Sequence, residues 1–369
     1  MFSRARARRQ VWSRTSHTVS FGPGFRSWVS TVAYLVASEV SAGGSRQEQV
    51  IPLPAHGWGL EINTCTYLAE GFGSYHWIVT DAAGRRHFVT VDDLDHKGWL
   101  GETRDAAFQS LRVAFDTALA LRQSGLEFVV APLPTARGQT LLRIGPRHTL
   151  ALFPFVDGRS GRFGEEINSA DRAALLRMLM ALHQATPATK ATRSLTQHQR
   201  IRLPGRRGLE RALMNLEDTW AGGPFAEPAR DWLARHATSL RRLLNEIDCL
   251  DDAVTAAGRP PVITHGEPHP GNLMRVGDGL MLVDWDTVGL APPERDLWMV
   301  ATTGGEELAL YVEAARRDID EAAMSLYRLS WNVSDIAAYM DLFQSPHGHN
   351  EDTERAWINL TQDIRLQDC

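Results

Sequence analysis

Residues 262–289 read VITHGEPHPGNLMRVGDGLMLVDWDTVG and place six side chains that bind metals or move protons around two short apolar runs: His265, Glu267, His269, Asn272, Asp284 and Asp286. The runs VITHG and LMRVGDGLMLVDW are typical of short strands, and VGDG is typical of a hairpin turn. Pro268, Pro270 and Gly271 argue against a helix between the two runs. We therefore expect a tight loop and a β-hairpin that present the polar side chains.

Zinc chemistry is one interpretation of this stretch. On an extended strand, His265, Glu267 and His269 would face the same side. Zinc enzymes that use two histidines one turn apart need them on a helix, which the prolines and the glycine disfavour. A zinc deaminase would also need a P-C-x-x-C sequence, and none of the three cysteines supplies one. Metal-dependent hydrolysis is therefore the weaker alternative.

Phosphoryl transfer is the stronger interpretation. The reaction needs a carboxylate near the nucleophile and oxygen ligands for Mg²⁺. Glu267, Asn272 and Asp284 supply these groups in that order, and Asp286 is close enough to assist. The two histidines then have structural roles: His265 would bond the backbone and hold the loop, and His269 would be a surface residue of the loop.

The rest of the chain divides into a strand-rich part and a helical part. From residue 60 to 156, short runs rich in β-branched and aromatic residues predict strands, among them 126–132, and one helix at 103–125 follows the third strand. Residues 157–164, DGRSGRFG, are the predicted linker. Beyond them, amphipathic runs predict helices that the hairpin interrupts. The order predicts an α+β fold with a small sheet lobe at 51–156 and a larger helical lobe at 157–369.

Composition narrows the class of protein. A net charge of -5 gives no general attraction to nucleic acid. No run approaches the roughly 20 apolar residues of a membrane span. The cysteines form no CxxC pair, which fits a reducing cytosol and a cytoplasmic protein. Residues 1–50 hold six arginines and no acid before Glu39, and a seventh arginine at position 46. We interpret them as a disordered extension, with an organelle presequence or a signal peptide as alternatives.

The sequence HGEPHPGN, followed by LVDWDTVGLAPPERDLW, resembles the aminoglycoside phosphotransferase family of the protein-kinase-like superfamily. That family has H-G-D-x-x-x-x-N and then a strand ending in D-W/F-D/E, and the likeness covers about residues 50–365. The resemblance implies a two-lobe kinase-like fold and transfer of the ATP γ-phosphate, with Mg²⁺, to a hydroxyl of a small molecule. It also implies that Glu267 is the catalytic carboxylate, that Asn272 and Asp284 hold the metal, and that Asp296 is a structural acid.

The resemblance extends to the nucleotide site. Residues 152–158, LFPFVDG, would be the hinge whose backbone bonds adenine, and they include Phe153 and Phe155. The sequence EGFGSYHW would be the loop that covers the nucleotide, where Gly71 and Gly73 let the backbone approach phosphate beside Ser74. The Walker sequence G-x-x-x-x-G-K-[ST] is absent, so the chain is not a P-loop enzyme.

Three departures from the family pattern lead to a second hypothesis. Glu267 stands where the family has Asp, and a displacement of that size can cost about 100-fold in rate. Thr90 stands near the position of the phosphate-pairing lysine, for which Lys97 is the nearest substitute. The helix at 103–125 lacks an obvious Glu partner for that lysine, and the candidates are Glu102, Asp105 and Asp116. The alternative is therefore a non-catalytic nucleotide- or ligand-binding protein with a kinase-like fold.

The C-terminal part offers candidates for acceptor recognition. From residue 300 onward the chain has 13 acidic residues against five arginines and no lysine. Such a surface would attract a cationic acceptor such as an aminocyclitol, or it would simply be solvated helix faces. Trp331, Asp335 and Tyr339 recur every four residues and would share one helix face, either in contact with the acceptor or in the core. Choline or a sugar alcohol would also fit.

Overall fold

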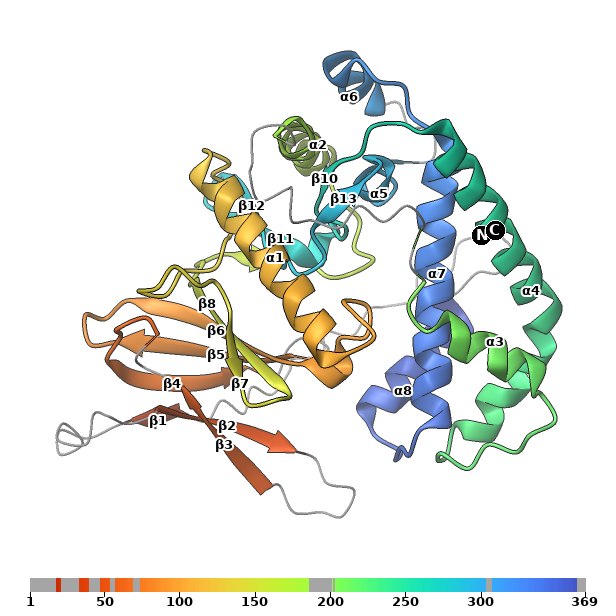
Figure 1. Ribbon diagram of the computed structural model, residues 1–369, viewed down its shortest axis with the longest axis horizontal. Helices are drawn as coiled ribbons and strands as arrows, with labels where there is room; N and C mark the ends of the chain where they lie inside the picture. Colours follow the sequence, from red (N-terminus) through yellow and green to blue (C-terminus); the bar gives the residue numbers. More distant parts are fainter. Residues whose placement is uncertain are drawn as a thin grey trace, which may run out of the picture.

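The computed structural model describes residues 18–20, 33–39, 47–53, 57–68, 74–185, 201, 203–302 and 307–363. A large antiparallel sheet lies at one side of the molecule and a group of long helices at the other, with two small sheets between them (Figure 1). This arrangement confirms the α+β class. The predicted lobe boundaries stay a prediction.

The large sheet contains six strands in the order β1-β4-β5-β6-β8-β7. They are β1 (Thr18–Ser20), β4 (Ile62–Leu68), β5 (Ser74–Asp81), β6 (Arg86–Asp93), β7 (Leu142–Ile144) and β8 (His148–Pro154). Side chains alternate between the two faces of a strand. Trp77, Val89 and Val91 pack into a core on one face, and Thr90 and Asp92 line a cleft on the other.

Helix α1 (Arg104–Gln123) forms where the sequence predicts a helix at 103–125. It begins at Thr103, whose hydroxyl accepts a hydrogen bond from the backbone N–H of Ala106 at 3.1 Å. Its buried Leu111 and Phe115 pack in one cluster with Ala151 of β8. The helix therefore covers part of the sheet beside the cleft (Figure 1).

Residues 126–132 do not form the predicted strand. Val129 makes only an isolated bridge to Leu282, and Val129 and Ala131 are buried in a cluster with residues of the helical part. A short apolar run has the same composition whether it pairs in a sheet or is buried as a connection. The prediction was wrong because burial, rather than strand pairing, accounts for the apolar pattern.

The Arg-rich segment at residues 1–50 also contains strands. Strand β1 pairs with β4, and β2 (Ala33–Glu39) pairs with β3 (Gln47–Leu53). Outside these paired stretches, the disordered extension at residues 1–50 stays a prediction. The other residues of that segment lie outside the described ones.

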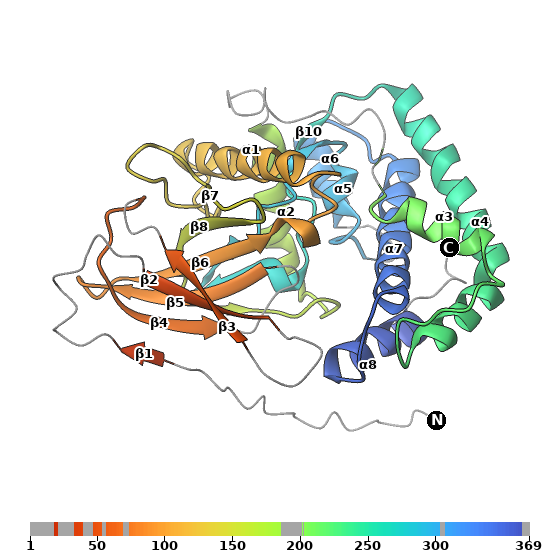
Figure 2. The ribbon, with the colours of Figure 1, turned by 60° about the horizontal axis from the view of Figure 1, so that its bottom comes forward.

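Seven helices in the described residues make up most of the second part: α2 (Ser169–Gln184), α3 (Arg206–Met214), α4 (Ala226–Ala257), α5 (Glu294–Leu297), α6 (Leu308–Ala315), α7 (Glu321–Gln344) and α8 (Glu351–Ile358). Helices α4 and α7 lie side by side (Figure 2) and share a core that includes Leu240, Ile247, Ile336 and Phe343. Within the described ranges, no helix is both long and apolar enough to cross a membrane.

The opening stretch of the sequence forms the predicted hairpin and also a second strand pair that we did not predict. Strand β10 (Val262–Thr264) pairs with β13 (Gly289–Ala291). Strand β11 (Leu273–Val276) pairs with β12 (Gly279–Leu282) through a turn at Gly277, which has a φ of 56° that favours glycine. Strand β11 also pairs with β9 (Arg159–Ser160), which lies within the predicted linker. We call residues 262–289 the catalytic hairpin region below.

Candidate active site

A cleft of about 2170 Å³ lies between the large sheet, the catalytic hairpin region and α7. Ten residues that the sequence singled out line it: Ser74, Lys97, Phe153, Phe155, Glu267, Asn272, Asp284, Asp286, Trp331 and Asp335. Gly71 and Gly73 lie outside the described residues, so their part in nucleotide binding stays a prediction. Strand, loop and helix residues far apart in the sequence thus meet at one cleft.

His265 holds the loop, as its structural interpretation predicts. Its Nε2–H donates to the carbonyl of Val283 at 2.9 Å, and its Nδ1 accepts from the N–H of Glu267 at 3.2 Å. The ring is fully buried, and burial lowers its pKa to about 4. Since both ring nitrogens are engaged by the backbone, the side chain is neutral and does not serve as a metal ligand with Glu267.

Asp296 fixes the start of the catalytic loop. Its carboxylate is fully buried and accepts from the N–H groups of His265 at 2.9 Å and Gly266 at 2.7 Å. His183 of α2 lies 3.1 Å away and reaches Tyr311 through its other nitrogen. Hydrogen bonding and the nearby histidines hold the pKa of Asp296 below its usual value despite burial, which by itself would raise it. This geometry agrees with the structural role that the resemblance implies.

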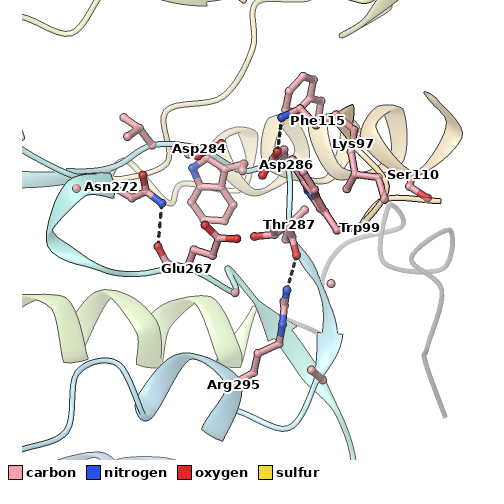
Figure 3. A pocket seen from close by; sticks show the side chains of 18 of the residues that line it. Lys97, Trp99, Ser110, Phe115, Glu267, Asn272, Asp284, Asp286, Thr287 and Arg295 are labelled. Carbon is pink, nitrogen blue, oxygen red and sulfur yellow. Dashed lines mark hydrogen bonds and ion pairs between the residues drawn. The ribbon is translucent and has the colours of Figure 1, made fainter. Parts of the chain in front are cut away.

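Glu267 and Asn272 lie on the same loop and face the cleft. The Asn272 amide donates to the backbone carbonyl of Glu267 at 3.0 Å (Figure 3). This hydrogen bond does not involve the Glu267 carboxylate. Burial and the nearby Asp286 raise the pKa of Glu267 to about 7, against the lowering effect of Arg295 and Lys97. A carboxyl group with a pKa near neutrality is suited to accept a proton.

Asp284 follows β12 in an unusual backbone conformation. Its φ of 62° is in the left-handed region, which costs about 1 kcal/mol or more for a residue with a Cβ. The next residue, Trp285, is fully buried, donates its indole N–H to Leu282, and packs edge-on against His265 at 4.7 Å. The anchored indole thus holds the turn that leaves the Asp284 side chain in the cleft. Burial, Asp286 and Glu267 raise its pKa, while Lys97 opposes the rise.

Lys97 reaches this acidic group from the sheet side. Its ammonium lies 2.9 Å from a carboxylate oxygen of Asp286 and 3.2 Å from one of Asp92 (Figure 3 shows the first contact). It also lies 5.1 Å from the ring centre of Trp99. The side chain is 5% exposed. The three carboxylates Asp286, Asp92 and Asp284 raise the pKa of Lys97 against the lowering effect of burial, so it is cationic.

The predicted acidic partners of Lys97 lie elsewhere. Asp105 pairs with Arg143, Asp116 accepts the hydroxyl of Thr140 at 2.6 Å, and Glu102 lies 3.6 Å from an exposed Arg207. Thr90, near the strand position to which the resemblance assigns a lysine, lines the cleft and contacts His76. The acid beside Lys97 is instead Asp92, two residues along the same face of β6.

The sheet side of the cleft contains the residues predicted to bind nucleotide that the structure describes. Phe153 and Phe155 line it at the end of β8, and Phe155 lies under the guanidinium of Arg86 at 4.1 Å. Ser74 also lines the cleft, but its hydroxyl donates to Asp92 at 2.7 Å. Ser74 therefore orients the carboxylate of Asp92. The predicted contact of Ser74 with phosphate stays a prediction.

A match to the phosphotransferase enzyme family, APH, covers residues 64–327. The chain belongs to this family. Its members are ATP-dependent kinases that phosphorylate hydroxyl groups, which confirms the predicted class of reaction. Protein StrN of Streptomyces griseus is 27% identical to the phosphotransferase over 253 residues, which cover 68% of this chain and 75% of StrN.

Solved structures confirm the kinase-like fold of the phosphotransferase. A spectinomycin phosphotransferase in complex with ADP and spectinomycin has a TM-score of 0.64 at 18% identity and covers 84% of this chain and 92% of its own. A microcompartment-associated aminopropanol kinase has a TM-score of 0.54 at 14% identity, with coverage of 84% and 97%. At these identities the likeness shows the fold alone.

The donor set of the phosphotransferase fits Mg²⁺ bound together with a nucleotide. Among the described residues, no three His, Cys, Asp or Glu side chains form a metal-binding group on their own. Asp284, Asp286 and the Asn272 amide offer oxygen atoms at the same wall of the cleft. Mg²⁺ is usually held by one or two carboxylates and completed by substrate phosphates and water. The residues present therefore match that cation and not an all-protein cage.

Helix α7 of the phosphotransferase places Trp331 and Asp335 at the cleft but not Tyr339. The Tyr339 hydroxyl accepts from Asn359 at 3.2 Å, and its ring packs on the core of α4 and α7. A residue advances about 100° around a helix, so four residues overshoot one turn by about 40° and eight by about 80°. The prediction that all three residues share the acceptor face was wrong for Tyr339.

Several aromatic contacts around Trp331 escaped the sequence reasoning. Phe163 stacks on Trp331 with ring centres 5.7 Å apart and meets His269 edge-on at 5.0 Å. His269 is therefore not the surface residue that we predicted: its side chain is 16% exposed, and burial lowers its pKa to about 4. Trp298 lies 6.1 Å from Trp331. Only the tertiary structure brings these rings together, because they come from four separate segments.

Proposed function

We propose that the chain transfers the γ-phosphate of ATP to a hydroxyl of a small, cationic, polyhydroxylated acceptor, with Glu267 as the catalytic carboxylate. The observation that carries the proposal is the convergence of Glu267, Asn272 and Asp284 with Lys97 in one cleft. The pKa of about 7 for Glu267 supports a base role near neutral pH. The longer side chain in place of Asp is compatible with this role because its carboxyl group lies in the cleft.

In the proposed reaction the acceptor oxygen attacks the γ-phosphorus, and a new phosphorus–oxygen bond forms. The bond from that phosphorus to the β,γ-bridging oxygen breaks, and ADP leaves with the electron pair. The hydroxyl proton passes to the Glu267 carboxylate. Bound Mg²⁺ would neutralise phosphate charge, and Asn272 and Asp284, assisted by Asp286, would hold it. Most of the rate gain would come from positioning and charge stabilisation.

We propose that nucleotide and acceptor occupy opposite ends of the cleft. Phe153, Phe155 and Ser74 are the candidates for the nucleotide end, together with Gly71 and Gly73. Lys97 would seat the phosphates between the two ends. This division follows from the elements that supply the residues: the sheet at one end and α7 at the other.

The acceptor class is inferred from the wall that α7 contributes. Trp331, Trp298 and Phe163 supply aromatic surface, and Asp335 supplies a carboxylate at the same wall. Ser330 lines the cleft, and its buried hydroxyl has no partner within the described residues. Aromatic rings with a carboxylate and a free hydroxyl suit a ring compound that carries both amino and hydroxyl groups.

The test is phosphate transfer from γ-labelled ATP, with Mg²⁺, to a panel of aminoglycosides, aminocyclitols including spectinomycin, choline and sugar alcohols. Asp284→Asn is the inactive control. Transfer that the control abolishes would establish the reaction and name the acceptor class. ATP binding without transfer to any acceptor would favour the alternative of a non-catalytic nucleotide-binding protein. Absence of ATP binding would refute the proposal.

A further inference from the structure

Lys97 occupies a position that the kinase-like pattern assigns to no residue. It follows the short 3₁₀ helix η2 (Leu94–His96), which directly succeeds β6 and turns the chain back. The ammonium consequently returns to the level of Asp92, five residues earlier. At Thr90, where a strand lysine is expected, the side chain is too short to reach phosphate and bonds His76 instead.

Asp92 is held as firmly as the lysine that it contacts. Its carboxylate is 2% exposed and accepts hydroxyl hydrogen bonds from Ser74 at 2.7 Å and from Thr149 at 3.1 Å. Those two hydroxyls come from the strands on either side of β6, so the carboxylate is fixed within the sheet. The second partner of Lys97, Asp286, belongs to the catalytic hairpin region. Lys97 is thus shared between the sheet and the catalytic hairpin region.

We propose that Asp92 is the positioning residue for Lys97, and that this pair replaces the strand lysine and helix acid of other kinase-like enzymes. The inference rests on the proposed function, because it assumes that Lys97 binds the phosphates of ATP. Lys97 exchanges Asp286 for phosphate oxygens when ATP enters, and Asp92 keeps the ammonium in place during the exchange. Asp286 is then available as an oxygen donor for the divalent cation.

The proposal predicts an effect opposite to simple charge repulsion. Asp92 is one of four carboxylates around the phosphate site, with Asp284, Asp286 and Glu267. Removing a carboxylate near a bound polyanion would by itself strengthen the binding of that anion. If Asp92 instead acts through Lys97, its removal leaves the ammonium paired with Asp286 alone and no longer held beside the phosphates, which weakens ATP binding. Whether the removal of Asp92 strengthens or weakens ATP binding therefore distinguishes charge repulsion from positioning of Lys97.

The experiment is a double-mutant cycle on the dissociation constant of ATP at saturating Mg²⁺, measured by calorimetry on the full chain. Asp92→Asn is expected to weaken ATP binding by about tenfold when Lys97 is present, and by less than about twofold in the Lys97→Met background. Asp81→Asn is the matched control, since Asp81 is also a 2% exposed, ion-paired aspartate of the sheet but lies outside the cleft lining. It should lower stability and leave ATP affinity unchanged.

Two outcomes would overturn the proposal: tighter ATP binding by Asp92→Asn, or an equal loss in both backgrounds. Thr149→Val provides a milder variant if Asp92→Asn does not fold. It removes one hydrogen bond to Asp92 and is expected to weaken ATP binding by about threefold, again only with Lys97 present. Failure of the wild-type protein to bind ATP would refute the proposed function itself, whereas normal binding with additive substitutions would refute only the pairing of Asp92 with Lys97.

Discussion

Replacing Glu267 with Gln is expected to abolish transfer and also to stabilise the fold at alkaline pH. Burial raises the pKa of this carboxyl group from 4.5 to about 7, so the folded protein binds its proton more tightly than the unfolded chain does. The resulting contribution to stability is fully present below about pH 4.5 and is lost as the pH rises through about 7. Wild type is therefore destabilised by ionisation of Glu267, and the glutamine variant is not.

The size of this effect follows from the shift in pKa. One pKa unit corresponds to about 1.4 kcal/mol, so the full shift gives an upper limit of about 3 kcal/mol. The side chain is 29% exposed in the cleft, and solvent screening reduces the expected gain to about 1–2 kcal/mol. Glu267→Gln should therefore exceed wild type by that amount at pH 8, and should match it at pH 4.5.

Urea unfolding of both proteins at pH 4.5 and pH 8, without nucleotide or metal, measures the difference. Glu313→Gln, at an exposed glutamate of α6, controls for the loss of one negative charge. A variant that is no more stable than wild type at pH 8, or equally more stable at both pH values, would refute the reasoning. Residual transfer by Glu267→Gln at more than about one hundredth of the wild-type rate would refute the base role.

Three further predictions concern the same cleft. The kcat/KM for the acceptor should rise about tenfold from pH 6 to pH 8, because a base with a pKa near 7 ionises over that interval; a flat profile would contradict it. Asp296→Asn should lower the free energy of unfolding in urea by about 3–5 kcal/mol, since buried N–H groups lose a charged acceptor, and a loss below about 1 kcal/mol would count against its structural role. Trp331→Ala and Asp335→Asn should each raise the acceptor KM about tenfold and leave the ATP KM unchanged. Tyr339→Phe should change neither constant. An equal rise in the acceptor KM for Tyr339→Phe would put that residue in the acceptor site.

The sequence predicted best where chemistry and local structure coincide. Residues 262–289 combine turn residues, short apolar runs and polar groups at fixed spacing, so the hairpin, the loop-holding role of His265 and the loop that carries Glu267 followed from local rules. The run at 126–132 and the position of Tyr339 did not follow. In both cases a correct local pattern, apolar content or helical spacing, was compatible with two environments, and only packing against distant segments selected one.

The proposed acceptor wall was predicted only in part for the same reason. Trp331 and Asp335 share a helix, so their spacing placed them together. Phe163 and Trp298 complete the wall from a loop and from the residue after α5. Single aromatic residues in such segments carry no signal that distinguishes a ligand contact from the core. His183 is a similar case, because a histidine on an apolar helix face does not reveal that its partner is Asp296.

Lys97 shows how a site can keep its charges while the sequence pattern is lost. A search along β6 finds Thr90 and suggests that the phosphate site lacks its lysine. The turn after β6 nevertheless returns an ammonium to the same face of the sheet, where Asp92 and Asp286 hold it at 3.2 Å and 2.9 Å. Phosphoryl transfer requires a cation held in a fixed position beside the phosphates. It does not require that this cation come from the position of Thr90 on β6. The missing strand lysine is therefore weak support for a lost activity, and the dependence of ATP affinity on Asp92 decides between a relocated lysine and a degenerate site.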